Sequence, residues 1–221
     1  MLITGIIGQD CKMQTANLIN FILSASGKKV SIFDIKNFAN TDHIEDYLSE
    51  LQKKNVDILI CRISANHDLK NIIGYMNFDV MICEDKADDI KEIGIWNYTT
   101  MIKDVFSLLS GKGTFIVNVD NIELIKMLYG KGLYTVTYGF NPKASITTSS
   151  VGDDLSQENF MCCLQRSIST RIGNIIEPQE YRINIYSQEL DPYNILAAAS
   201  FAIVNDVDLN ALEMINPVLA L

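Results

Sequence analysis

Short apolar runs alternate with amphipathic segments through the first two thirds of the chain, and this alternation limits the fold more than any other feature. The apolar runs LITGII, KVSIF, DILIC and FDVMIC are continuous, without alternating polar residues. Continuous apolar strands are typical of a parallel sheet that helices cover on both faces. The segments between the runs have helical periodicity, as in residues 12–26, 96–110 and 122–129. We therefore predict an α/β fold with a mostly parallel sheet flanked by helices.

The pattern changes after Pro142. Three β-rich stretches lie between about residues 143 and 187, namely ASITTSSVG, NFMCCLQRSIS and EYRINIYS, and no helix-length segment separates them. They predict a small antiparallel β element attached to the main sheet. An Ala-rich helix is expected from Tyr193 to about Asn205, followed by a shorter one at residues 209–215. No linker or repeat interrupts the chain, so we expect a single domain over residues 1–221.

The bulk properties exclude several partners. The formal net charge of −9 argues against a nucleic acid or an anionic membrane, because both are polyanions. No apolar stretch reaches the roughly 18 to 20 residues that a membrane span needs. The five cysteines form no CxxC pair, and His43 and His67 lack metal-ligand spacing relative to them. We therefore expect reduced thiols, no cysteine or histidine metal site, and a cytoplasmic location.

The first strand–turn–helix junction, GIIGQDCKMQT, carries part of a phosphate-binding loop. Such a loop needs small residues where backbone amides approach phosphates, a lysine for the β- and γ-phosphate oxygens, and a Ser or Thr for Mg²⁺. Gly8 and Lys12 fit this pattern, whereas Cys11 replaces the usual glycine and Met13 the usual Ser or Thr. The same residues also fit an ordinary junction in which Lys12 faces water. The junction therefore allows ATP binding without requiring it.

Five segments, in the same order along the chain, resemble the central, nucleotide-binding domain of the Mur ligases and folylpolyglutamate synthases. The loop and helix from Gly8 to Val30 resemble the family's T-G-T-N-G-K-T-T-T loop and the turn that ends its helix. The strand GTFIVNVDN resembles the family's N-x-D-D strand end. Asn118 and Asp120 match that motif, and Asn121 stands in place of its second acid.

The other three segments follow downstream. TVTYGFNPKASITTSS resembles the family's T-Y-G stretch, and LDPYNILAAASFAI resembles its H-N-x-x-N-A-L-A-A helix. In that helix Asn194 matches the second asparagine and Asp191 replaces the first. The final INPVLAL resembles the P-V-x-G-R linker that ends the domain. The resemblance thus extends from residue 1 to about residue 218.

The resemblance implies a P-loop-type three-layer domain from an ATP- and Mg²⁺-dependent amide ligase of cell-wall peptidoglycan synthesis. In that family the domain activates a carboxylate as an acyl phosphate, which an amine then attacks. Lys12 and Lys103 align with catalytic positions, Lys103 with a lysine that many members carbamylate. The positions that align with nucleotide-binding residues are Gly8, Gln9, Asp10, Cys11, Lys12, Met13, Asn118, Asp120 and Asn194. The resemblance covers neither an N-terminal UDP-binding domain nor a C-terminal ligase domain, so we expect a protein partner to supply them if ligation occurs.

The metal ligands that the resemblance implies are mostly replaced. The loop threonine is Met13 here, and a thioether is a poor ligand for Mg²⁺. The family's E-x-S-S-H strand end aligns with Arg62 to Ala65, followed by Asn66 and His67, so an arginine stands where a metal-binding glutamate is expected. Further along, oxygen ligands remain only at Glu84, Asp85, Asp88 and Asp89. We therefore expect no metal site.

Several of these residues also have an ordinary structural interpretation. Arg62 could form an ion pair with the acids at residues 84–89, which we favour, or bind a phosphate directly through its guanidinium fork. Asn194 fits either a helix cap or an adenine contact. Lys103 also fits an exposed helix lysine, and Cys11 a small loop residue rather than a reactive thiol.

Two functions follow from the sequence. The first is an ATP-binding part of an amide-forming ligase, catalytically impaired on its own. The second is a pseudoenzyme that kept the fold, lost the metal site, and acts as a nucleotide- or ligand-binding or protein-interaction module. For activity, Met13 and Arg62 favour the pseudoenzyme. For fold and ancestry, the five collinear segments favour the ligase domain.

Overall fold

The computed structural model describes residues 1–8, 14–35, 44–64, 76–85, 90, 94–149, 159–184 and 190–212. The chain divides into two compact units that are interleaved in sequence. The first unit contains Met1–Cys11, Lys28–Phe115 and Asn121–Thr135. The second contains Lys12–Gly27, Ile116–Asp120 and Val136–Leu221.

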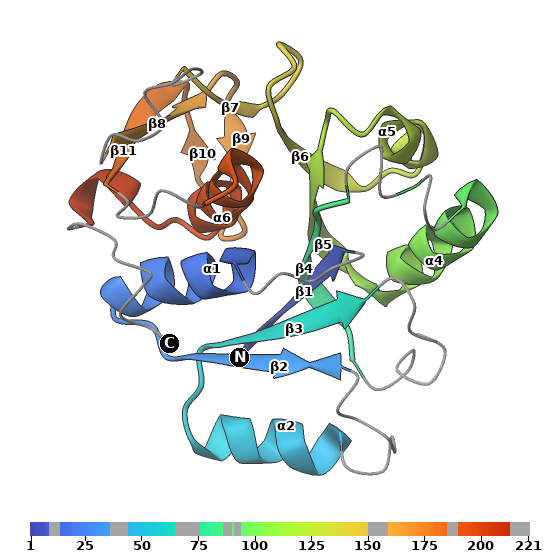
Figure 1. The fold of residues 1–221 in the computed structure, drawn as a ribbon. Coiled ribbons are helices and arrows are strands. Elements are labelled where there is room, and N and C mark those ends of the chain that lie inside the picture. Colours follow the sequence, from blue (N-terminus) through green and yellow to red (C-terminus); the bar gives the residue numbers. More distant parts are fainter. Residues whose placement is uncertain are drawn as a thin grey trace. The chain divides into compact units, whose positions relative to one another are not determined.

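Strands and helices alternate through the first part of the chain, as the sequence predicts (Figure 1). The strands are β1 (Leu2–Gly8), β2 (Val30–Asp34), β3 (Ile58–Ser64), β4 (Phe78–Cys83), β5 (Leu109–Asn118), β6 (Tyr134–Tyr138), β7 (Ile146–Thr148), β8 (Asn159–Leu164), β9 (Ile168–Ser169), β10 (Ile175–Ile176) and β11 (Gln179–Asn184). The helices are α1 (Gln14–Ala25), α2 (Ile44–Lys53), α4 (Ile95–Leu108), α5 (Ile122–Leu128) and α6 (Pro192–Val204), with a 3₁₀ turn, η5 (Leu209–Ala211), after α6.

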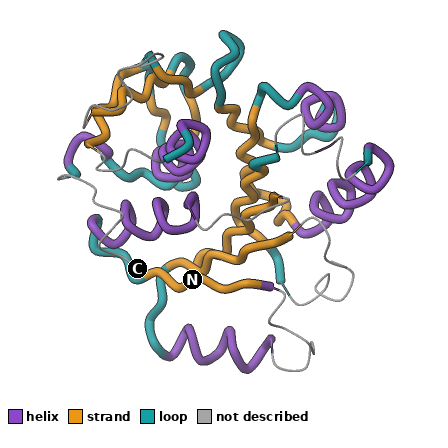
Figure 2. Tube along the Cα trace, viewed as in Figure 1, coloured by secondary structure: helices purple, strands orange, loops and turns teal. Residues whose placement is uncertain are grey.

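The main sheet has the strand order β11-β8-β7-β6-β5-β4-β1-β3-β2 and is mostly parallel. β1 pairs in parallel with β3 and β4, and β2 pairs in parallel with β3. By contrast, β8 pairs antiparallel with β7 and β11, and β9 and β10 form a separate antiparallel pair. The α/β fold and the antiparallel element after Pro142 are therefore confirmed. Figure 2 shows the purple helices beside the orange strands.

The first unit has its core in the strands around β1. Leu59, Ile60 and Cys61 on β3 are consecutive and fully buried, as the prediction of strands covered on both faces requires. A parallel strand needs a crossover connection, and α2 supplies it between β2 and β3. The strand β5 begins at Leu109, directly after α4, and so extends further back than the apolar run GTFIVNV predicts.

The second unit has its core around α6. Every residue from Ile195 to Val204 is buried, because the helix is apolar on all sides and packs against α1 and β7. α1 ends at Ala25, two residues before the predicted stop at Gly27, which has the left-handed backbone (φ 77°) that favours glycine after a helix. The short strand β10 lies in a stretch where the sequence indicates only a polar turn.

Some predicted elements lie outside the described residues, including the short helix at residues 67–73 and the last three residues, 213–215, of the final predicted helix. Among the helices that the structure describes, none combines the length and the apolar character needed to cross a bilayer.

Candidate functional site

In the second unit, polar residues from several segments meet at the carboxyl ends of β5 and β6. Asn118 ends β5, and its buried side-chain oxygen accepts a hydrogen bond from the backbone N–H of Asp120 at 3.0 Å. The Asp120 carboxylate accepts backbone N–H bonds from Phe140 at 2.7 Å and from Asn141 at 3.0 Å. Tyr193, in the first turn of α6, donates its hydroxyl to the same carboxylate at 3.1 Å. Asp120 therefore ties the turn after β6 to the start of α6.

Gly139, the residue directly after β6, makes this arrangement possible. Its φ of 146° lies in the region that side chains rarely adopt. A Cβ at this position would lie 2.5 Å from Oδ2 of Asp120 and 3.2 Å from Oδ1 of Asn118. The glycine of the T-Y-G stretch thus lets the Asp120 carboxylate approach the backbone.

An aromatic pair covers this carboxylate. The rings of Phe140 and Tyr193 pack edge to face, with 4.7 Å between their centroids and 80° between their planes. Burial raises the pKa of Tyr193 to about 12, and the negative charges of Asp120 and Asp191 contribute to the increase. The phenol therefore stays protonated at neutral pH and remains a donor to Asp120.

Tyr193 should make the protein lose stability as the pH rises from about 10 to about 12. An unfolded tyrosine loses its proton near pH ~10, whereas folded Tyr193 keeps its proton up to about pH 12. In this window the folded state binds more protons, so the free energy of unfolding falls with pH. Urea titrations at about pH 9 and about pH 11 should show a smaller fall in Tyr193→Phe than in the native protein. Tyr129→Phe, at an exposed site, is the control, and an equal fall in native protein and Tyr193→Phe would contradict the assignment.

Asn194 does not cap α6, so that interpretation of the sequence is wrong. Asp191 is the cap, since its Oδ1 accepts the backbone N–H of Tyr193 at 2.9 Å and Pro192 follows in the first turn. Asn194 instead donates its Nδ2 to Oε1 of Gln14, in the first turn of α1, at 2.6 Å. This bond joins the starts of α1 and α6. The adenine contact stays a prediction.

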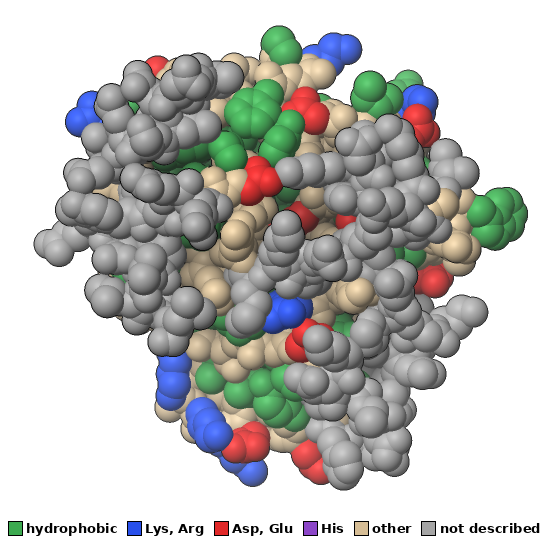
Figure 3. Space-filling model, in the orientation of Figure 1, with side chains coloured by type: hydrophobic (Ala, Val, Ile, Leu, Met, Phe, Trp, Pro, Cys, Tyr) green, Lys and Arg blue, Asp and Glu red, His purple; other side chains and the backbone are tan. Residues whose placement is uncertain are grey.

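In the first unit, Arg62 forms an ion pair at the carboxyl ends of β2 and β3. Its Nη2 lies 3.1 Å from Oδ2 of Asp34, and each side chain is 16 % exposed. Figure 3 shows Lys and Arg side chains in blue and Asp and Glu side chains in red on one face of the molecule. The ion-pair interpretation is therefore correct in kind, but the observed partner is Asp34 and not Glu84 or Asp85, whereas Asp88 and Asp89 lie outside the described residues. Asp34 is the partner because β2 lies beside β3, with Asp34 and Arg62 in register.

Two acids lie beside Gly8 at the ends of β1 and β4. The backbone N–H of Glu84 donates to the carbonyl of Ile7 at 2.9 Å, which continues the pairing of β1 with β4. A Cβ on Gly8 would lie 3.9 Å from a carboxylate oxygen of Glu84 and of Asp85. Within the described ranges, no group of three or more His, Cys, Asp or Glu side chains is placed to hold a metal ion.

A buried polar network surrounds Asp85. The Sγ of Cys83 lies 3.6 Å from Oδ2 of Asp85 and 3.6 Å from the hydroxyl of Tyr98. Burial raises the pKa of the Cys83 thiol well above its usual value, and the charge of Asp85 adds to this. Asn121 donates to the Asp85 carbonyl at 2.9 Å and to the Tyr98 hydroxyl at 3.3 Å, and accepts the Leu124 N–H at 3.0 Å as the cap of α5. A carboxylate could not donate these two bonds, which explains an amide where the resemblance implies a second acid.

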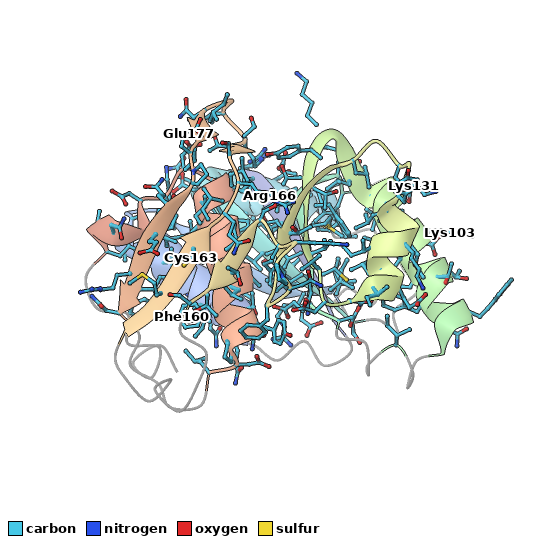
Figure 4. All side chains as sticks on the ribbon, turned by 90° about the horizontal axis from the view of Figure 1, so that it is seen from above. Lys103, Lys131, Phe160, Cys163, Arg166 and Glu177 are labelled. Atoms are coloured by element: carbon cyan, nitrogen blue, oxygen red, sulfur yellow. The ribbon has the colours of Figure 1, made fainter. Side chains whose placement is uncertain are left out.

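The remaining predicted residues are one exposed lysine and a group that lies outside the described ranges. Lys103 is exposed on α4 and points away from the strands in Figure 4, as an ordinary helix lysine does. The residues outside the described ranges are Gln9, Asp10, Cys11, Lys12, Met13, His43, His67, Asp88 and Asp89. Their roles in the loop and the acidic segment stay predictions.

The sequence did not identify four residues that shape these clusters, namely Gln14, Asp34, Phe140 and Tyr193. Three of them act on positions far away in the chain, and no local pattern indicates such contacts. Only Phe140 carried a signal, because it directly follows the glycine of the T-Y-G stretch.

The fold defines an α/β domain with a mostly parallel sheet flanked by helices. A family model described as the Mur ligase middle domain matches residues 8–202, so the chain belongs to the Mur ligase family. No curated protein sequence matches the chain.

Several solved structures share this fold at low sequence identity. The ligase UDP-N-acetylmuramoyl-L-alanyl-D-glutamate–2,6-diaminopimelate ligase is 12 % identical with a TM-score of 0.68, and the match covers 95 % of this chain and 45 % of that one. MurF from Acinetobacter baumannii is 14 % identical with a TM-score of 0.65, covering 97 % and 46 %. The apo form of FPGS from L. casei is 12 % identical with a TM-score of 0.57, covering 94 % and 60 %. The chain thus spans less than half the length of the first two proteins.

Proposed function

We propose that the chain is a nucleotide-binding Mur ligase middle domain that has lost the metal-dependent part of the ligase reaction. The ion pair between Arg62 and Asp34 carries this proposal. It places a guanidinium, held by a carboxylate, where the resemblance implies a glutamate that binds Mg²⁺. Mg²⁺ prefers several oxygen ligands in octahedral geometry, and a cation at this position repels it. On its own the chain would then act as a pseudoenzyme.

The second unit supports a nucleotide as the ligand. Three residues that align with nucleotide-binding positions form hydrogen bonds near the end of β5 or the start of α6. They are Asn118, Asp120 and Asn194. One of the similar solved structures is a complex of FPGS with AMPPCP, 12 % identical and with a TM-score of 0.57. We propose an adenine nucleotide as the ligand, with Lys12 contacting its phosphates.

Calorimetric titration with ATP tests nucleotide binding. We expect saturable heat from the native protein and a roughly 10- to 100-fold weaker affinity in Lys12→Ala, the range that corresponds to one lost charge-assisted hydrogen bond. Lys112→Ala, which removes an exposed lysine from β5, should bind ATP as the native protein does. No heat from the native protein at about 1 mM ATP would overturn the proposed function.

The similar ligases favour a second candidate function, in which the chain is the middle part of an active ligase. Other ligase domains, such as those of a partner protein, would then complete the active enzyme, in the cytoplasm and in peptidoglycan synthesis. A Mg²⁺-dependent ATP affinity of the native chain would favour this candidate, because a working ligase needs its Mg²⁺ site.

A further inference from the structure

The guanidinium of Arg62 is only partly used in its ion pair. Its Nη2 donates to Asp34, whereas its Nε–H is buried and has no hydrogen-bond partner within the described part of the chain. A guanidinium usually binds a carboxylate through two parallel bonds, so one donor of the fork is left without an acceptor. A buried donor of this kind is uncommon, and its natural complement is an additional oxygen acceptor.

The position of Arg62 indicates where that acceptor comes from. Arg62 lies near the carboxyl end of β3, in register with Ile6 on β1 and with Asp34, the last residue of β2. In open α/β sheets, ligands bind outside the carboxyl ends of the parallel strands. The unpaired Nε–H of Arg62 is therefore at the edge of the sheet where a ligand is expected.

We propose that Arg62 binds an oxyanion directly, as a fixed cation that needs no metal, and that this oxyanion is a phosphate group. The planar fork matches the spacing of phosphate oxygens. Asp34 competes with the ligand, because its carboxylate already occupies Nη2 and carries the same charge sign as a phosphate. The identity of the ligand as a nucleotide rests on the proposed function, whereas the oxyanion site rests on Arg62 alone.

Asp34→Asn gives the most specific test, because it weakens the competitor and leaves Arg62 in place. Calorimetry in EDTA should show ATP binding several-fold tighter in Asp34→Asn than in the native protein. Arg62→Gln should bind ATP at least about tenfold more weakly, the range expected for a lost charge-assisted hydrogen bond. Arg62→Lys keeps the charge but loses the fork, so its ATP affinity should lie between those of the native protein and Arg62→Gln.

Titrations with adenosine and with inorganic phosphate show which part of ATP depends on Arg62 for binding. Adenosine has no phosphate, so its affinity should be equal in native protein and Arg62→Gln, and equal values also show that the variant is folded. If phosphate binds in an Arg62-dependent way but neither ATP nor adenosine binds, the oxyanion site stands and the proposed function fails. If ATP binds equally to the native protein, Arg62→Gln and Asp34→Asn, the inference about Arg62 is overturned and the proposed function stands.

Discussion

The double variant Met13→Thr with Arg62→Glu is expected to bind ATP at least about tenfold more tightly with Mg²⁺ than without it, an effect of about 1.4 kcal/mol or more. The substitutions introduce a hydroxyl and a carboxylate, which are the hard oxygen ligands that Mg²⁺ prefers. They also remove the positive charge of Arg62 and place a second carboxylate next to Asp34. In the native protein the ratio of the two affinities should stay near one. Calorimetric titration with and without Mg²⁺ measures both ratios.

A matched variant distinguishes the effect of the new carboxylate on Mg²⁺ dependence from the effect of removing the arginine. Met13→Thr with Arg62→Gln removes the cation but adds no charged oxygen, so its Mg²⁺ dependence should be much smaller. Thermal unfolding of both variants shows whether the missing ion pair with Asp34 has disturbed the fold. If the double variant with glutamate shows no dependence on Mg²⁺, these two positions do not explain the proposed loss of the metal site.

Asp120→Ala is expected to lower the free energy of unfolding by about 2 to 4 kcal/mol, since charge-assisted hydrogen bonds contribute roughly 1.5 to 3 kcal/mol each and this site is partly exposed. The change leaves the backbone N–H groups of Phe140 and Asn141 and the hydroxyl of Tyr193 without their acceptor. The turn after β6 and the start of α6 then lose their common anchor. Urea unfolding followed by circular dichroism measures the loss.

Two further variants test whether Asp120 acts through these bonds. Asp120→Asn keeps one oxygen acceptor and the same shape, so it should cost less than alanine. Glu180→Ala removes an exposed acid from β11 in the same unit and should change the stability little, within about 0.5 kcal/mol. Equal stability of Asp120→Ala and native protein would show that the observed hydrogen bonds do not hold this turn.

The order of secondary structure was predictable because it depends on local pattern. Continuous apolar runs identify strands that are buried on both faces, and β3 shows this with three consecutive buried residues, Leu59 to Cys61. Gly27 also indicates the end of α1, because glycine is the residue that most often takes the left-handed conformation after a helix.

The partners of individual side chains were less predictable, because they depend on which strands are neighbours. The sequence places Arg62 closer to the acids at residues 84–89, but β1 lies between β3 and β4, whereas β2 is adjacent to β3. Because β2 is the neighbour of β3, Asp34 lies next to Arg62 and pairs with it. The cap of α6 is a different case, because Asp191 followed by Pro192 is a recognised start signal that identifies the cap without any structure.

The ATP affinity of the native protein, measured once with Mg²⁺ and once with EDTA, tests the central claim most directly. We propose that this Mur ligase middle domain binds its nucleotide without a metal, because Arg62 and Met13 stand where the resemblance implies oxygen ligands. The two affinities should then agree within about twofold, a difference of roughly 0.4 kcal/mol. An affinity at least about tenfold tighter with Mg²⁺ would show a working metal site and would contradict the account.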